Sequence, residues 1–188
     1  MSTGLQLDIR LQDGYADLVR DGLDLAVRAG PLQDSTLVAK RIDSQQLVLV
    51  ASPAYLADRG TPRRLDDLAR HAAVVFRMPS TGRMRPWQLS QGKPRRAVEW
   101  TPDPSVQVND GEGMVEAAIA GLGLAQVPDY MATAAQARGA LVEVLPGLRP
   151  APMPISVVYP SARLVPPRVR VALIALAVLS QRKHPARP

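Results

Sequence analysis

The segment that most constrains the fold of this chain is Val108–Met131, VNDGEGMVEAAIAGLGLAQVPDYM. Asn109 is a favourable N-cap residue and Glu112 follows three positions later, so the two can form a capping box that begins a helix. Apolar residues then recur at helical spacing until the AGLG tetrapeptide, where a left-handed glycine can end the helix. A short apolar strand, Leu124–Val127, follows. This order of helix, glycine turn and buried strand predicts part of an α/β core.

The same segment also indicates a ligand site, because the first turn of a helix directs unpaired amide groups outward. The alternative is an ordinary helix and strand packed in a core, since capping boxes are common. Spacing alone does not separate these two interpretations.

Strands and helices alternate along the rest of the chain. Ser52 is expected to cap a short helix, 54–58, that ends before Gly60, and the stretch 78–104, rich in proline and glycine, is expected to form a hairpin and loops. Strands alternating with helices imply a mostly parallel sheet with right-handed crossovers. The remaining expected strands span 5–11, 23–27, 37–40, 46–51, 73–77, 106–108, 141–145 and 155–159, and the remaining helices span 13–21, 65–70, 129–137 and 168–181.

Composition and length describe a compact protein. A chain of 188 residues, 46% of them hydrophobic, can bury one substantial core or two small ones. It contains no cysteine, which excludes disulfides, thiol nucleophiles and thiolate metal sites and fits a cytoplasmic protein. The opening residues MSTGLQLDIRLQD carry no export-signal pattern. The longest apolar run, 171–179, is about half of the roughly 20 residues that a membrane-spanning helix needs, so no membrane partner is expected.

The net charge of +6 raises the question of nucleic-acid binding. The arginines are scattered in pairs such as Arg63–Arg64 and Arg95–Arg96 and do not form a stripe. Aromatic residues that could stack on bases are scarce, with four Tyr, two Trp and one Phe. We therefore expect a solvated basic surface, and we do not expect this chain to grip DNA by itself.

No catalytic motif is present in the sequence. It lacks a G-x-S-x-G elbow, an H-E-x-x-H pair and a phosphate loop of the G-x-x-x-x-G-K type. The two histidines, His71 and His184, are expected at the surface, and the acidic residues Asp66–Asp67 and Asp103 have no neighbours that would complete a metal site. We therefore expect no catalytic residue, no metal site and no cofactor.

The segment Val108–Met131 resembles the signature of the effector-binding domain of LysR-type transcriptional regulators, in which an N-D-G-E helix start precedes A-G-L-G-[IL]-A-x-[LV]-P. The resemblance covers nearly the whole chain. Four further segments are similar to blocks of that family in the expected order: DGLDLAVRAG (21–30), LVASPAYLADRGTPRRLDDLARH (49–71), GALVEVLP (139–146) and VYPSARLVPPRVR (158–170).

The resemblance implies an α/β fold of the type 2 periplasmic-binding-protein-like kind, with two Rossmann-like subdomains joined by two crossing strands. Residues 1–50 plus 153–188 would form the first subdomain and 51–152 the second, with a hinge near 48–51 and 145–157. A small-molecule effector would bind in the cleft between them and control DNA binding and transcription through a helix-turn-helix domain. The chain is thus expected to sense a ligand without transforming it.

Parts of the family pattern have no counterpart in this sequence, namely the winged helix-turn-helix, the linker helix and the first strand and helix of the effector domain. The first subdomain is therefore expected to be incomplete, and promoter DNA would be reached only through the missing N-terminal domain. Because an unfilled strand position leaves apolar surface open and 171–179 is apolar all round, a homo-oligomer is expected. A truncated or mis-started gene product, a domain fragment and a gap filled by another chain all stay open as explanations.

Ligands of parallel α/β sheets bind beyond the carboxyl ends of strands, and the resemblance brings four loops and a strand to that position. Arg28 could pair with a carboxylate, and the amides of the helix start favour a carboxylate or another small anion. Each assignment has an ordinary alternative: Asn109 as a cap only, Arg28 paired with Asp24 or Glu112, and 80–82 as a surface turn. The expected effector-binding residues are Gln12, Asp13, Arg28, Ala29 and Gly30 of the first subdomain and Met78, Ser80, Thr81, Gly82, Asn109, Asp110, Gly111, Ala125, Gln126 and Pro128 of the second.

Two other functions stay open beside that of a regulator. One is a free two-lobed solute-binding protein, against which the lack of an export signal stands. The other is a truncated oligomerisation partner, which would co-purify with a full-length regulator. The sequence does not identify the effector.

Overall fold

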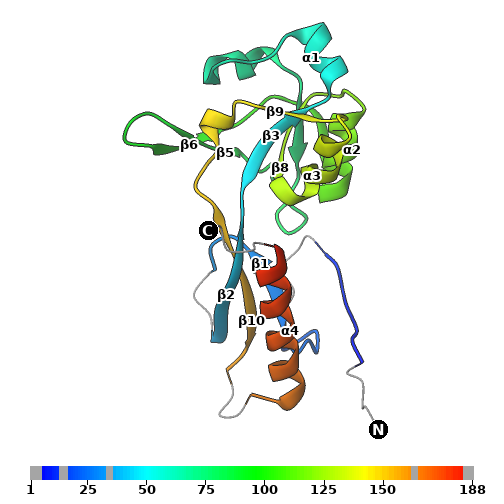
Figure 1. Ribbon diagram of the computed structural model, residues 1–188, viewed down its shortest axis with the longest axis vertical. Helices are drawn as coiled ribbons and strands as arrows, with labels where there is room; N and C mark the ends of the chain where they lie inside the picture. Colours follow the sequence, from blue (N-terminus) through cyan, green and yellow to red (C-terminus); the bar gives the residue numbers. More distant parts are fainter. Residues whose placement is uncertain (1–5, 13–16, 33–35, 162–164, 184–188) are drawn as a thin grey trace. The chain divides into compact units, whose positions relative to one another are not determined.

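The computed structural model describes residues 6–12, 17–32, 36–161 and 165–183. The chain divides into two compact units, one made of residues 1–44 and 153–188 and the other of residues 45–152 (Figure 1). We call them unit 1 and unit 2. Both combine strands with helices, which confirms the α/β class expected from the sequence.

Unit 1 contains a three-stranded sheet with the order β1-β10-β2. β1 runs antiparallel to β10, in a register that pairs Ala26 with Val158 and Ala29 with Ile155. The last strand of the chain therefore lies at the centre of this sheet. The elements of the unit are β1 (Ala26–Ala29), β2 (Leu37–Gln45), β10 (Met153–Pro160) and helix α4 (Pro167–Lys183).

The amino-terminal part of unit 1 differs from the sequence expectation. The strand expected over 5–11 is wrong for the residues described there, because residues 6–12 have no regular structure and Ile9 and Leu11 are 73% and 93% exposed. Alternating apolar residues form a strand only beside another strand, and none of the described strands pairs with them. The helix expected over 13–21 begins outside the described residues, and its described part is a turn in which the N–H of Asp21 donates to the carbonyl of Asp17 at 2.8 Å.

Unit 2 is built on a five-stranded sheet with the order β7-β4-β8-β3-β9, beside which β5 and β6 form a hairpin. Its helix α3 matches the helix expected from the sequence residue for residue, and Ser52 caps α1 as expected by accepting the N–H of Tyr55 at 3.3 Å. The elements are β3 (Leu47–Ala51), α1 (Pro53–Arg59), the 3-10 helix η1 (Leu65–Arg70), β4 (Ala73–Phe76), β5 (Trp87–Gln91), β6 (Arg96–Trp100), β7 (Pro104–Val108), α2 (Gly111–Ile119), β8 (Leu124–Pro128), α3 (Asp129–Ala137), β9 (Val142–Val144) and the 3-10 helix η2 (Pro146–Leu148).

The sheet of unit 2 is buried on both faces, as β3 shows most clearly. All five residues of β3 are buried. Val48 and Val50 pack among residues of α2 and α3, whereas Leu49 and Ala51 pack among residues of α1, η1 and the β5–β6 hairpin. A run that is apolar at every position, LVLVA, is typical of a strand covered on both faces.

The expectation of a mostly parallel sheet holds only in part. β4 is parallel to β7 and to β8, whereas β3 is antiparallel to both of its neighbours, β8 and β9. In unit 1, β1 and β10 are also antiparallel. The alternation of strands and helices along the sequence does not tell which two strands pair. It therefore does not tell whether neighbouring strands run parallel or antiparallel. None of the helices in the described part of the chain is long and apolar enough to cross a membrane.

Candidate functional site

β4 and β7 are parallel neighbours, so their carboxyl ends lie at the same edge of the unit 2 sheet. Phe76 of β4 faces Val108 of β7, and the pairing continues because the N–H of Arg77 donates to the carbonyl of Val108 at 2.7 Å. The segments 78–82 and 109–111 therefore leave the sheet side by side. The structure thus brings together two of the loops expected to hold the effector.

The segment 78–82 forms a tight turn. The N–H of Gly82 donates to the carbonyl of Met78 at 2.8 Å, and Gly82 adopts a left-handed φ of 68°. The hydroxyl of Thr81 accepts the N–H of Arg83 at 3.3 Å, which leaves its hydrogen available to donate. Ser80 and Thr81 are both exposed, so two hydroxyl groups face solvent at this edge.

The helix start beside this turn differs by one residue from the expectation. The N-cap of α2 is Asp110, whose carboxylate accepts the N–H of Gly113 at 2.7 Å, so the capping box of Asn109 and Glu112 is wrong. Asp110 has the extended backbone of a cap, and Asn109 precedes it as an exposed residue. The alternative in which Asn109 serves only as a cap is thereby also wrong, and its side-chain amide lies at the surface next to the helix start.

Two glycines of the NDGEG sequence have a packing reason. A Cβ at Gly111 would lie 2.6 Å from Cε of Met131, and a Cβ at Gly113 would lie 2.8 Å from Cγ1 of Val108. Glycine lets the first turn of α2 lie directly against β7 and α3. These two residues therefore position the helix start that the site is expected to use.

The AGLG sequence returns the chain from α2 to β8. Gly121 has a left-handed φ of 77°, and Gly123 has a φ of 150°. A Cβ on Gly123 would collide with the backbone carbonyl of Ala72, the group that accepts the N–H of Leu124 at 2.9 Å. The most recognisable part of the motif therefore serves the fold, by bringing two backbone segments into close contact.

The strand expected to form the floor of the site has structural contacts of its own. Ala125 is fully buried in the core beneath α2 and α3. The side-chain amide of Gln126 accepts the N–H of Gln88 at 2.8 Å and donates to the carbonyl of Gln88 at 2.7 Å, which ties β5 to β8. Pro128 is half-buried and precedes the first residue of α3. These side-chain contacts of Ala125 and Gln126 were not predicted from the sequence.

Of the residues expected to contribute from unit 1, Arg28, Ala29 and Gly30 lie at the end of β1. Gln12 is exposed, whereas Asp13 lies outside the described residues. Arg28 is half-buried and Ala29 is exposed, and the N–H of Gly30, which has a φ of 96°, donates to the carbonyl of Pro154 at 2.9 Å. β1 and β10 thus fix the position of this short segment.

Asp24, one of the alternative partners considered for Arg28, is engaged by another cation. Nε of Arg168 donates to both carboxylate oxygens of Asp24 at 2.9 and 3.0 Å. This hydrogen-bonded pair lowers the pKa of Asp24 below its usual value. The pair ties the first turn of α4 to the segment before β1.

Three arginines around the turn 78–82 were not predicted as site residues. Arg77 and Arg83 flank the turn and are exposed, and the guanidinium of Arg85 lies 4.8 Å from the centre of the Phe76 ring. The sequence signal that could have revealed them is the RMPSTGRMR stretch, which places three cations around two hydroxyl residues. They add positive charge beside the amino end of α2, which also carries the carboxylates of Asp110 and Glu112.

His71 was expected at the surface, and it is half-buried instead. Its Nδ1 lies 3.1 Å from the hydroxyl of Tyr55, and that hydroxyl accepts the N–H of Ala72 at 2.9 Å. Which of the two groups donates in this bond is set by the tautomer of the His71 ring. Burial lowers the pKa of His71 and raises the pKa of Tyr55. The pair joins α1 to the segment before β4. The other histidine, His184, lies outside the described residues.

Comparison with known proteins identifies the family of the chain. The LysR substrate binding domain family matches residues 3–178, and the chain belongs to this family. It is a family of transcriptional regulators and not of enzymes, which agrees with the expectation from the sequence. Because the regulatory domains of the family have the type 2 periplasmic-binding-protein-like fold, that expectation is confirmed as well.

Relatives and solved structures similar to this chain are regulators. An uncharacterized HTH-type transcriptional regulator, YhjC of Escherichia coli, is 34% identical over 175 residues, which is 93% of this chain and 58% of that protein. The regulatory domain of CrgA from Neisseria meningitidis has a TM-score of 0.76 at 28% identity, over 88% of this chain and 79% of that one. The full-length Vibrio cholerae virulence activator AphB also has a TM-score of 0.76, at 25% identity, over 92% of this chain and 57% of that one. The chain thus spans about half the length of the curated relatives that it matches.

Proposed function

We propose that this chain is the effector-sensing part of a LysR-type transcriptional regulator. It binds a small molecule in a cleft between the subdomains 1–50 plus 153–188 and 51–152, and binding alters transcription through a helix-turn-helix domain that is not in this sequence. The observation that carries the proposal is made at one edge of the unit 2 sheet. There the exposed residues Ser80 and Thr81, which follow β4, lie beside the start of α2. Its family relatives are HTH-type regulators.

The effector that this edge favours is a carboxylate or another small anion. The amides at the start of α2 present the positive end of a helix dipole, and hydroxyls can donate to a carboxylate from the neighbouring turn. Arg77 and Arg83 add positive charge beside them, and Arg28 adds a cation from the end of β1. Binding of this kind needs no covalent chemistry and no cofactor.

The regulator works as a homo-oligomer in the cytoplasm and contacts promoter DNA only through its helix-turn-helix domain. Supporting this, most of the exposed large apolar side chains among the described residues belong to unit 1. On α4, Val171, Ile174 and Val178 recur at helical spacing and are 53%, 63% and 44% exposed. A second copy of the chain is the partner that we propose for this apolar stripe, because oligomers of one chain pair identical surfaces.

The test is a thermal-shift screen of small carboxylates and phosphates against the chain. A ligand that binds the folded state raises the melting temperature. We expect Thr81→Val and Asn109→Ala each to abolish most of that shift while the melting temperature without ligand stays within a few degrees. The control is Thr101→Val at an exposed threonine away from this edge, which should keep the full shift. Equal shifts in all three variants would place the effector elsewhere.

A further inference from the structure

The chain passes between the two units at two points, after Ser44 and after Pro152. The strands that carry these crossings, β2 and β10, are hydrogen-bonded neighbours in the sheet of unit 1. On the side of unit 2, the single residue Gln46 separates the end of β2 from the start of β3. Gln46 therefore lies where the chain enters unit 2. We call the chain at this point the incoming segment, and the residues up to Pro152, where the chain leaves unit 2, the outgoing segment.

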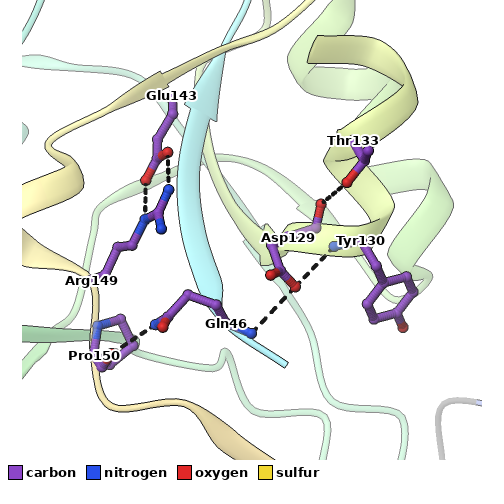
Figure 2. A network of polar contacts seen from close by, with 7 residues as sticks. All are labelled: Gln46, Asp129, Tyr130, Thr133, Glu143, Arg149 and Pro150. Carbon is purple, nitrogen blue, oxygen red and sulfur yellow. Dashed lines mark hydrogen bonds and ion pairs between the residues drawn. The ribbon is translucent and has the colours of Figure 1, made fainter. Parts of the chain in front are cut away.

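Gln46 also contacts the outgoing segment, as Figure 2 shows. Its backbone N–H donates to Oδ1 of Asp129 at 3.3 Å, and its carbonyl accepts the N–H of Asp129 at 2.8 Å. Its side-chain Nε2 donates to the carbonyl oxygen of Pro150 at 2.7 Å. Asp129 is the first residue of α3, and its carbonyl accepts the hydroxyl of Thr133 at 2.9 Å. The backbone of Gln46 is thus bound to the first residue of α3, and its side chain binds the outgoing segment at Pro150.

The β2–β10 ladder does not continue into unit 2 along the outgoing segment, because β10 begins only at Met153. Pro150, Pro152 and Pro154 occupy alternate positions and lack the N–H groups that a strand ladder needs. The carbonyl of Pro150 would lose its partner if the side-chain amide of Gln46 were absent. This amide therefore replaces a backbone hydrogen bond at the place where prolines interrupt the ladder.

A second side chain fastens the outgoing segment further upstream. Nη2 of Arg95 donates to the carbonyls of Gly147 and Arg149 at 2.7 and 3.0 Å. The later of these two acceptors, the carbonyl of Arg149, belongs to the residue before Pro150. The Gln46 bond lies closer to the crossing than these two bonds, and residues 151 and 152 after it are exposed.

We propose that Gln46 is a positioning residue that makes the two crossings bend together. An effector that shifts a sensor between two states must bias a movement of one part against another. Because Gln46 ties the incoming chain to the outgoing chain at the edge of unit 2, neither crossing can shift at this point without the other. Bending of the two crossings is then a joint movement. This inference rests on the sensing function proposed above.

The test labels each unit with a dye, which is practical because the chain has no natural cysteine. Cysteines at the exposed Ala137 of unit 2 and Ala175 of unit 1 carry the dyes, and single-molecule energy transfer gives the distribution of dye separations. Gln46→Met keeps the side-chain length and removes the amide donor. We expect a broader distribution, and amide exchange in peptides covering 43–47 and 149–155 about tenfold faster, the effect of losing one hydrogen bond.

The matched control is Arg95→Met, which removes two hydrogen bonds to the same segment and the Nε bond to Ser90, and leaves the Gln46 bond in place. It should speed exchange around 146–149 and leave the dye distribution unchanged. A dye distribution in Gln46→Met identical to that of the parent would overturn the inference, and so would faster exchange spread evenly over unit 2. No effector is used, so this result is independent of the screen with Thr81→Val, whose failure would count against the effector site alone.

Discussion

Two adjacent residues, Asn109 and Asp110, are equally good helix caps, and only one can occupy the cap position. Asp110 takes it and accepts the N–H of Gly113. Asn109 then lies one residue earlier, exposed and outside the helix. Substitution of Asn109 therefore leaves the cap of α2 intact, which makes this residue a cleaner probe of ligand binding than Asp110.

His71 gives a prediction on pH. Its pKa is lowered in the folded chain because burial disfavours the charged ring, so the neutral form contributes stability above the unfolded value near 6.5. That contribution is lost as pH falls from 6.5 through the lowered pKa, because the charged ring is poorly solvated where it is partly buried. The loss is at most about 1 kcal/mol, since the ring stays partly exposed to solvent.

The measurement for His71 is urea unfolding of the chain and of His71→Asn between pH 7 and pH 5. Asparagine has an acceptor oxygen that does not titrate, so the variant should be less sensitive to acid than the parent. Other groups titrate equally in both proteins and cancel in the difference. The same slope of stability against pH in both proteins would contradict a role of the Tyr55–His71 bond.

At the scale of elements, the junction between α2 and β8 depends on one glycine. Gly123→Ala would press a Cβ against the backbone of Ala72, in a left-handed conformation that side chains rarely adopt. Backbone atoms cannot move aside as a flexible side chain does, so we expect a loss of more than about 3 kcal/mol in the free energy of unfolding.

The control for that junction is Gly139→Ala. Gly139 also has a left-handed φ, 74°, but an added Cβ would meet nothing within 4 Å. Its loss should be about 1 to 2 kcal/mol, the conformational penalty alone. Denaturant unfolding followed by circular dichroism measures both, and equal losses would show that the contact with Ala72 is unimportant.

The elements that could be predicted are those with local signals at both ends. Helix α3 lies between Pro128 and Gly139, and β3 is apolar at all five positions, so spacing and breakers were sufficient. The start of α2 was misplaced by one residue because two neighbouring caps compete. The strand expected around Ile9 failed because alternation describes a side-chain pattern and does not supply a partner strand.

The candidate site was predictable only where it follows from strand ends. The proximity of 78–82 to 109–111 follows from the parallel register of β4 and β7. It was expected from the family resemblance, because the alternation of elements does not tell which strands pair. The contacts of Gln126 with Gln88 could not be predicted, because they join residues 38 positions apart through a side chain. Such contacts depend on the folded arrangement and leave no local pattern in the sequence.

At the scale of the whole molecule, the exposed stripe on α4 predicts self-association. Burying three aliphatic side chains at an interface is favourable by about 25 cal/mol per Å² of apolar surface. We expect the chain to be a dimer or larger at micromolar concentration, and we expect Ile174→Glu with Val178→Glu to convert it to a monomer. Light scattering coupled to gel filtration measures the mass directly.

The control for self-association is Leu122→Glu, which changes an exposed apolar residue of unit 2 and should leave the mass unchanged. A parent chain that is monomeric at these concentrations and binds no hydrophobic dye would contradict the prediction. A loss of mass in the control as well would indicate that charge alone, and not the stripe on α4, governs association.

The central place of β10 in the sheet of unit 1 has a consequence for synthesis on the ribosome. β1 and β2 are made early, but the strand that lies between them comes more than one hundred residues later. Unit 2 is continuous from 45 to 152, so all of its strands emerge before that strand does. Since domains generally fold as units during translation, unit 2 can fold first. The sheet of unit 1 can form only after β10 has emerged between β1 and β2.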